Sequence, residues 1–320
     1  MATGRDVLAS ATSAPSIPVN IVMRTRNRPR LLARALDDVL GQSSPQWVLT
    51  IVNDGGAPEP VDGLVAERSD AFANRVLVLH NPSSRGMEAA SNQGILARES
   101  RYVAVHDDDD TWDPTFLETT VRWLDDVANG SAPAVAVRTE IVWEEVLGAS
   151  VRELSREVFL PERTQITLTD LIRFNACVPI SMLYRRANLI DAGLFDESLP
   201  VAGDWECNLR LASTGQLGFL PDKVLAYWHQ RPGAVGDLGN SVVALRDDHR
   251  AQDALVRDRA LRRSVAEDGL GLPLYLTRFL DDRFDEMRER LDSLEGLARD
   301  RPFERMKRLV RAARPPWRAK

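Results

Sequence analysis

Four consecutive aspartates, Asp107 to Asp110, are the residues of this chain whose types and spacing point most directly to chemistry. They follow the apolar stretch Tyr102 to Val105 and precede Trp112. Carboxylates this close repel one another, and the repulsion falls only if a cation neutralises them or water solvates them. A solvated acidic loop is the plainer interpretation. The functional interpretation is a divalent cation, Mn²⁺ or Mg²⁺, held by carboxylate oxygens.

The residues after the acidic run favour the functional interpretation. Asp113 is a good helix N-cap and Pro114 a good first helical residue, so we expect the run to lie in a short loop between a strand and a helix. In an open α/β sheet, loops at the carboxyl ends of the strands line the ligand crevice.

The elements that position this loop follow an alternating pattern. Helical segments separate four apolar strands, which are predicted at 19–23, 47–52, 76–79 and 102–105. This alternation predicts parallel βαβ units with right-handed crossovers, and therefore a nucleotide-binding half. After a helix at 114–127 the pattern becomes mixed, and beyond about residue 240 it is helical.

Composition indicates an ordinary soluble protein. With 320 residues, 44% hydrophobic and 28% charged, the chain can form one large domain with an appendage. Cys177 and Cys207 are far apart and lack metal-type spacing, which argues against a disulfide framework or a zinc site and suits a reducing cytoplasm. Residues 1–17 contain no apolar run typical of a signal peptide and are expected to be a disordered lead-in, and no later stretch approaches a membrane span.

Several segments together resemble the family 2 glycosyltransferases with the GT-A fold. The similar segments span Pro18 to Arg231 and are Met23 to Pro29, Val52 to Gly56, Glu88 to Ile95, the Asp run in the place of a DxD motif, Gly203 to Arg210, and Tyr227 to Arg231. The resemblance implies a Rossmann-like α/β fold, with a mostly parallel sheet flanked by helices and a C-terminal helical extension.

The resemblance also implies roles for individual residues. By this resemblance Asp204 is the catalytic base, and Trp205 and Glu206 are residues that contact the acceptor. The metal ligands become Asp107, Asp109 and His229, with this register chosen because Trp112 then matches the family's spacing. The donor-binding set becomes Thr25, Arg26, Asn27, Arg28, Asp54, Asn92, Asp107, Asp108 and Arg231. Arg26 and Ser91 depart from the family pattern near the donor, which leaves the base and the sugar open.

The implied reaction is an inverting transfer of a sugar from a nucleotide-diphosphate donor of the UDP, GDP or dTDP type. The acceptor is a hydroxyl of a glycan or lipid-linked glycan. The metal meets the charge of the leaving diphosphate, and Asp204 takes the acceptor proton. Simpler interpretations are a helix N-cap for Asp204 and a hydrogen-bonded core residue for His229.

Two other functions compete with this one. A sugar-phosphate nucleotidyltransferase would need a Gly-rich phosphate loop, whereas the first turn here is Arg24 to Asn27. A non-catalytic nucleotide- or glycan-binding protein on the same fold would have no need of Asp204.

The C-terminal part suggests partners beyond the substrate. We predict four regions: the lead-in 1–17, a catalytic domain 18–235, a helical extension 236–300 and a basic tail 301–320. The tail has eight Lys or Arg and one acid, for a net charge of +7, which leaves −13 for the rest. Phe303, Met306, Leu309 and Val310 can share one helical face, so the tail resembles an interfacial helix for peripheral contact with the inner face of a membrane, with a solvated terminus as the alternative. No nucleic-acid partner is expected.

The helical extension carries a heptad seam. Its apolar residues, spaced by four and three, are Leu280, Phe284, Met287, Leu291 and Leu294. Such a seam predicts either a helix packed on the core, which we favour, or a contact in a homodimer.

Overall fold

The structure is a computed structural model that describes residues 18–147, 150–232, 234 and 246–299. The chain divides into two compact units, Met1–Ala254 and Leu255–Lys320, which are considered separately below. The division falls inside α10 (Arg246–Asp268). The predicted lead-in 1–17 and basic tail 301–320 lie outside the described residues.

The first half of unit 1 is a parallel sheet, as predicted. Its strands lie in the order β3-β2-β1-β4 and are β1 (Val19–Thr25), β2 (Trp47–Asp54), β3 (Val76–Asn81) and β4 (Tyr102–Asp107). The connecting helices are α1 (Pro29–Leu40), α2 (Pro58–Ala66), α3 (Ser69–Phe72) and α4 (Met87–Leu96). The helical segment expected between β2 and β3 is thus divided into two helices, α2 and α3.

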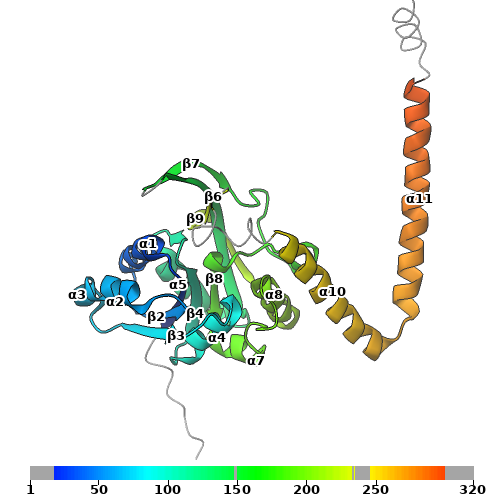
Figure 1. The fold of residues 1–320 in the computed structure, drawn as a ribbon. Coiled ribbons are helices and arrows are strands. Elements are labelled where there is room, and N and C mark those ends of the chain that lie inside the picture. The colour runs from blue at the N-terminus through cyan, green and yellow to red at the C-terminus, as the bar shows by residue number, and fades with distance from the viewer. Residues whose placement is uncertain (1–17, 148–149, 233, 235–245, 300–320) are drawn as a thin grey trace, which may run out of the picture. The chain divides into compact units, whose positions relative to one another are not determined.

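The second half extends the same sheet with antiparallel and parallel pairs. β8 (Met182–Arg185) pairs antiparallel with β4 and with β6 (Ala134–Leu147). β6 pairs parallel with β9 (Gly218–Gln230), which pairs antiparallel with β5 (Thr111–Trp112). β7 (Ser150–Val158) pairs antiparallel with β6, and the two project from the sheet in Figure 1.

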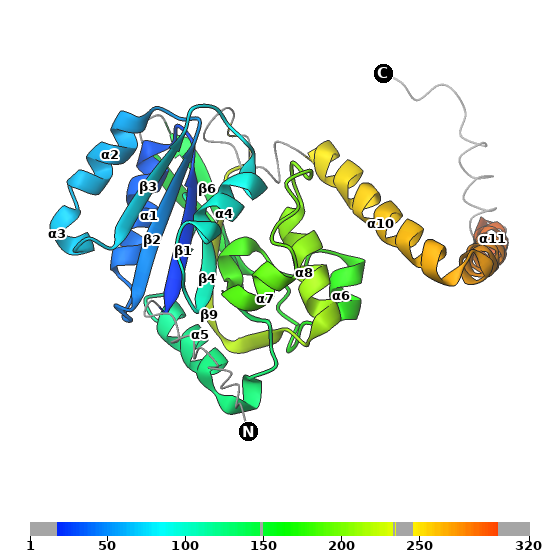
Figure 2. The ribbon, with the colours of Figure 1, turned by 90° about the horizontal axis from the view of Figure 1, so that it is seen from below.

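Helices cover both faces of this sheet, as predicted. The remaining helices of this half are α5 (Phe116–Asp125), α6 (Leu168–Arg173), α7 (Arg186–Asp191) and α8 (Gly203–Thr214), with short 3₁₀ turns at Val127–Asn129 and Pro179–Ser181. Alternate residues of β1 enter two cores, since Ile21 and Met23 pack with α1 and α5 while Val22 packs with residues of α4, α7 and α8. Figure 2 shows α4, α7 and α8 gathered on one face of the sheet.

Two predicted helix starts are wrong by one or two residues. Asp113 is not the N-cap of α5, because Thr115 occupies that position and Asp113 accepts hydrogen bonds from the Thr115 N–H at 2.9 Å and hydroxyl at 2.6 Å. Asp204 is not the N-cap of α8 either. Ala202 occupies that position with a left-handed φ of 65°, and Asp204 lies in the first turn. The N-cap interpretation of Asp204 is therefore excluded.

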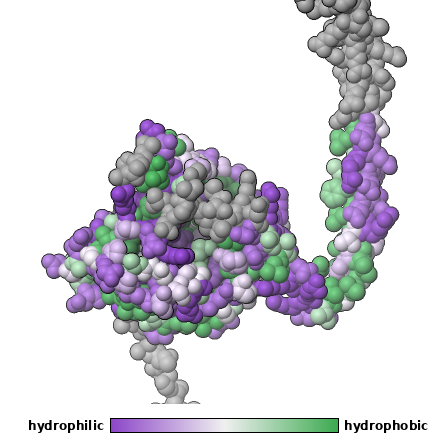
Figure 3. All heavy atoms as spheres, in the orientation of Figure 1, coloured by the Kyte–Doolittle hydropathy of each residue, from purple (hydrophilic) through white to green (hydrophobic). Residues whose placement is uncertain are grey.

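Unit 2 contains α11 (Gly271–Arg299), which carries the heptad seam. The five seam side chains are all about half exposed, from 50% for Leu280 to 62% for Leu294. Figure 3 shows hydrophobic residues along one side of this helix and hydrophilic residues along another. Among the described residues, no helix is both long enough and apolar enough to cross a membrane.

Candidate active site

The carboxyl ends of the parallel strands bring the predicted residues together. Arg24 near the end of β1 is in register with Asp107 at the end of β4, and Thr25 is in register with Asn53 of β2. The acidic run therefore begins at the edge of the sheet where an α/β fold binds its ligand, as expected.

Arginines neutralise much of the acidic run. Arg24 donates to Asp107 from Nε at 2.9 Å, and Arg28 Nη2 lies 2.8 Å from Asp108 Oδ1. Asp109 accepts hydrogen bonds from Arg28 at 3.3 Å and from the buried Arg231. The arginine guanidinium groups are therefore cations that supply part of the expected compensation, beside whatever a metal ion would add. The arginines come from β1, from the β1–α1 turn and from the position directly after β9, so each of them is distant in sequence from the acidic run.

The compensation is incomplete. Burial, with Asp109 beside it, raises the pKa of Asp108 to about 7, although Arg28 and Thr25 oppose the rise. Burial and the neighbouring carboxylates also raise the pKa of Asp110, which accepts the His229 N–H at 2.8 Å. Asp109 instead has a lowered pKa, because Arg28 and Arg231 outweigh its burial. The loop thus retains an affinity for further positive charge.

His229 lies beside the acidic loop but in a hydrogen-bond network of its own. Its Nδ1 is 2.7 Å from Glu144 Oε1, and its Nε2 is 2.8 Å from Thr111 Oγ1. Glu144 also accepts from Arg34 at 2.5 Å and from Arg231 at 3.0 Å. An ionised Glu144 assigns the ring proton to Nδ1, so that Nε2 accepts from Thr111.

The predicted metal ligands have suitable chemistry but do not form a set. Carboxylate oxygens and an imidazole nitrogen suit Mn²⁺, and the loop favours added positive charge. Yet within the described part of the chain, no three His, Cys, Asp or Glu side chains are spaced to hold a metal ion. A cation would have to compete with Arg24 for Asp107 and with Arg231 for Asp109.

Asp54 organises the loop that precedes α4, and its donor-binding role stays a prediction. Its carboxylate accepts from Asn81 at 2.9 Å, from Ser84 at 2.7 Å, and from the backbone N–H groups of Arg85 and Gly86 at 2.9 and 3.0 Å. These bonds lower its pKa despite burial. The loop they fix leads directly into α4.

The first turn splits into buried and exposed residues. Thr25 is buried and bonds Asp108 at 2.7 Å, whereas Arg26 and Asn27 are exposed. Asn27 has a left-handed φ of 54° and accepts the Ala57 N–H at 3.2 Å, so it connects this turn to the start of α2.

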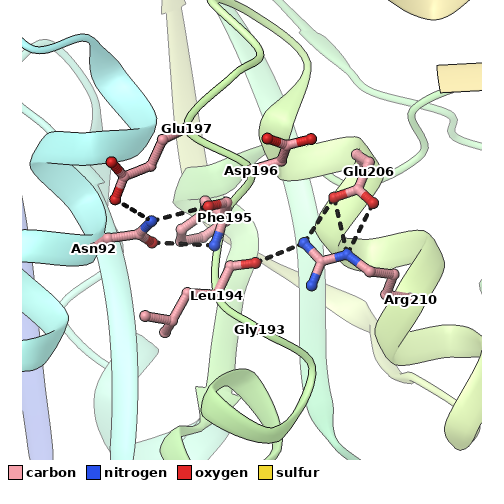
Figure 4. A pocket seen from close by; sticks show the side chains of 8 residues that line it. All are labelled: Asn92, Gly193, Leu194, Phe195, Asp196, Glu197, Glu206 and Arg210. Atoms are coloured by element: carbon pink, nitrogen blue, oxygen red, sulfur yellow. Dashed lines mark hydrogen bonds and ion pairs between the residues drawn. The ribbon is translucent and has the colours of Figure 1, made fainter. Parts of the chain in front are cut away.

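Two of the predicted site residues, Asn92 and Glu206, line a pocket apart from the acidic loop. Figure 4 shows Asn92 and Glu206 in a pocket of about 460 Å³ formed with residues 193–197 and Arg210. The Asn92 amide bonds both the O and the N–H of Phe195, at 2.9 and 3.0 Å. Glu206 pairs with Arg210 at 2.6 Å. Their contacts tie α4 and α8 to the loop 193–197, and the donor role of Asn92 and the acceptor role of Glu206 stay predictions.

Asp204 lines a second pocket, of about 380 Å³, together with Arg24 and Asp107. It accepts from the Asn175 amide at 2.8 Å. Burial raises the pKa of Asp204, although the bond from Asn175, the Trp205 N–H and Arg24 oppose the rise. A carboxylate of raised pKa next to a charged loop is suited to accept a proton. Trp205 borders the same pocket while its Nε1 donates to Leu171 O at 2.6 Å.

Sequence reasoning missed several polar residues of this region. A sequence feature could have identified Arg24, since it is a charged residue directly after the strand-like segment Val19 to Met23. Glu88 had a weaker one, as an acid beside Ala89 and Ala90. Glu144 had none, because it lies in a strand that also contains other acids.

The acidic loop and its arginines lie at the carboxyl edge of a sheet that helices cover on both faces, and comparison with known proteins identifies the family. Residues 20–191, more than half of the chain, match the family described as glycosyl transferase family 2. The chain therefore belongs to glycosyl transferase family 2.

Two relatives of similar length illustrate this membership. The chain is 26% identical over 254 residues to the uncharacterized glycosyltransferase YwdF of Bacillus subtilis, covering 79% of this chain and 85% of that protein. It is 29% identical over 268 residues to the succinoglycan biosynthesis protein ExoO of Rhizobium meliloti, covering 79% and 70%.

Solved structures share the fold. S. aureus TarS 1–349 in complex with UDP-GlcNAc matches with a TM-score of 0.55 and 17% identity, covering 80% of this chain and 76% of that one. The mannosyltransferase PcManGT from Pyrobaculum calidifontis in complex with GDP-Man and Mn²⁺ matches with a TM-score of 0.55 and 20% identity, covering 78% and 65%. The predicted fold class and family are confirmed.

Proposed function

We propose that this glycosyltransferase moves a sugar from a nucleotide-diphosphate donor to a hydroxyl of a glycan or lipid-linked glycan, with inversion and with Asp204 as the base. The observation that carries the proposal is the buried Asp204 carboxylate of raised pKa in a pocket shared with Arg24 and Asp107. A hydroxyl bound there can lose its proton to Asp204 as it attacks the anomeric carbon. Direct attack from the side opposite the nucleotide inverts that carbon.

The rest of the site supports the donor half of the reaction. Arg28 and Arg231 are cations at the carboxyl edge of the sheet and can meet diphosphate oxygens. Asp107, Asp109 and His229 are the side chains that would hold Mn²⁺ or Mg²⁺. The bound ion would neutralise charge on the leaving diphosphate. UDP-GlcNAc in TarS and GDP-Man with Mn²⁺ in PcManGT are compatible donor classes.

The acceptor half draws support from relatives and from the pocket. ExoO is named for succinoglycan biosynthesis, and an E. coli protein named as a putative colanic acid biosynthesis glycosyl transferase is 34% identical over 100 residues, covering 31% of this chain and 35% of that protein. Both names point to polysaccharide acceptors. A membrane-facing acceptor would also suit the basic tail.

Ligand-induced stabilisation tests this function without knowledge of the acceptor. We expect UDP-, GDP- or dTDP-sugars to raise the thermal midpoint, and Mn²⁺ to enlarge the shift, because a ligand at 100 times its Kd stabilises by about 2.7 kcal/mol. A CMP-sugar serves as the comparison. No shift with any nucleotide sugar, with or without Mn²⁺, would contradict the proposal, and binding without turnover would favour the non-catalytic alternative.

A further inference from the structure

A second carboxyl group, Glu88, lines the Asp204 pocket without any role in the chemistry described so far. Glu88 is the second residue of α4 and is only 5% exposed. Asp107 and Asp204 border the same pocket from β4 and α8. A buried acid at a pocket wall needs either a partner or a ligand.

The chain makes specific room for this side chain at the start of α8. A Cβ on Gly203 would lie 2.4 Å from Glu88 Cδ, so any larger residue there would displace the Glu88 side chain from its present position. The N–H of Gly203 also donates to the Glu88 carboxyl. The glycine and the acid are therefore matched across the two helices.

The surrounding charges cannot fully balance Glu88. Arg24 Nη1 lies 4.0 Å from Glu88 Oε2, beyond hydrogen-bond distance, while Arg24 Nε donates to Asp107 at 2.9 Å. Arg24 thus lies among three carboxyl groups of this pocket, those of Glu88, Asp107 and Asp204.

Burial keeps the Glu88 carboxyl protonated at neutral pH. It raises the pKa of Glu88 to about 8, with Asp204 and Asp107 adding to the rise and Arg24 opposing it. The Cys207 thiol on α8 also faces Glu88, and burial keeps that thiol protonated. The other charged groups at this pocket are Arg173, His249 and Asp253. At neutral pH Glu88 is therefore a neutral acid that can both donate and accept a hydrogen bond.

The rest of the wall has the chemistry of a carbohydrate subsite. Phe159 and Trp228 meet edge to face at 5.8 Å, and Phe174 and Trp205 also border the pocket. Aromatic faces bury the apolar side of a sugar ring while a few polar groups fix its hydroxyls. Asp204 and Glu88 are such groups on two helices.

We propose that Glu88 is a specificity-determining residue whose carboxyl group hydrogen-bonds a second hydroxyl of the acceptor sugar, next to the hydroxyl that reacts at Asp204. This inference rests on the proposed function. Glu88 selects acceptors by the position of that second hydroxyl. The isosteric Gln side chain keeps the bond, whereas Ala removes it.

Steady-state transfer to p-nitrophenyl glucoside, galactoside and mannoside tests the role, with the donor that gives the largest thermal shift. For the best of the three glycosides, Glu88→Ala should raise the acceptor KM about tenfold, with little change in donor KM. Glu88→Gln should stay within about threefold of wild type. Glu59→Gln is the matched control, because Glu59 is the second residue of α2 and is exposed.

The pH dependence separates this role from a purely structural one. In wild type the acceptor KM should rise as the pH passes about 8, where Glu88 loses its proton, and Glu88→Gln should lack that rise. The infrared difference between wild type and Glu88→Gln at pH 7 should contain the stretch of a protonated carboxyl. An unchanged acceptor KM in Glu88→Ala, the same alkaline rise in Glu88→Gln, or absence of that stretch would overturn the inference. No transfer by wild type to any of the three glycosides would overturn the inference alone, whereas the absence of a thermal shift with every nucleotide sugar would overturn the proposed function as well.

Discussion

Glu144 is the carboxylate that holds together the cations around His229. It is 4% exposed and bonds Arg34, His229 and Arg231, three residues that are 85 to 110 positions away in sequence. Bonds from His229 and Arg34 lower the pKa of Glu144 to about 2, although burial opposes the shift. An acid with a lowered pKa stabilises the fold most when it is ionised.

We expect Glu144→Gln to lower the free energy of unfolding at pH 7 by about 3 kcal/mol. The stabilisation is fully present above the ordinary glutamate pKa and is lost as the pH falls toward 2, so the two proteins should converge on acidification. Urea unfolding from pH 7 downward measures this. Glu145→Gln is the control, since the Glu145 side chain is 44% exposed and pairs with Arg152 on β7. Equal stability of wild type and Glu144→Gln at pH 7 would show that the network adds nothing.

Asp109 joins the predicted metal to the arginine network. We expect Asp109→Ala to remove Mn²⁺-dependent UDP binding and nearly abolish turnover, because Arg231 and any bound cation both lose this carboxylate. Calorimetry of UDP binding with Mn²⁺, and again with excess chelator, measures the dependence. Asp70→Ala on α3 is an exposed control. The metal hypothesis fails if turnover is undiminished in excess chelator or in Asp109→Ala.

At the scale of elements, the parallel half of the sheet is the part that sequence predicts best. Its strands are near-continuous apolar runs with polar residues at their carboxyl ends, so both the strands and the site edge are visible in the sequence. β7 was missed, because its apolar residues Val151, Leu154 and Val158 are three and four positions apart, a spacing that is typical of a helix and not of a strand. The partners of the Asp run were missed for another reason: Arg231 reaches Asp109 across 122 positions, and only the fold brings them together.

The heptad seam of α11 predicts either packing on the core or a homodimer contact, and a measurement of mass can distinguish the two. Its side chains are about half exposed within unit 2. Packing on the core and contact in a homodimer therefore both stay predictions, and the homodimer is the one that a measurement of mass tests directly. We expect a concentration-dependent dimer that Leu291→Asp dissociates, because a charge at the seam is costly to bury. Analytical ultracentrifugation measures the mass, and Leu261→Asp on α10, where Leu261 is 50% exposed, serves as control. A monomer at every concentration would refute the dimer.

At the scale of the whole molecule, the charge asymmetry predicts where the enzyme works. The +7 tail at 301–320 should attract an anionic membrane, with each basic residue near the surface contributing about 1 kcal/mol. We expect the full chain to co-sediment with anionic vesicles in a salt-dependent way, and a chain ending at Asp300 to stay in solution. Neutral vesicles are the control. Equal binding by the two forms, or binding indifferent to salt, would make a soluble acceptor the better hypothesis.

The central claim is that the buried Asp204 removes the acceptor proton, and the variant Asp204→Asn tests it most directly. The amide keeps the size of the side chain but cannot take a proton, so turnover should fall on the order of 10²-fold or more while the fold and donor binding persist. Donor-sugar turnover and donor Kd are measured on the same samples, with Asp191→Asn at the end of α7 as the exposed control. The account predicts a loss of turnover at unchanged donor Kd. Normal turnover by Asp204→Asn, or a loss explained wholly by weaker donor binding, would contradict it.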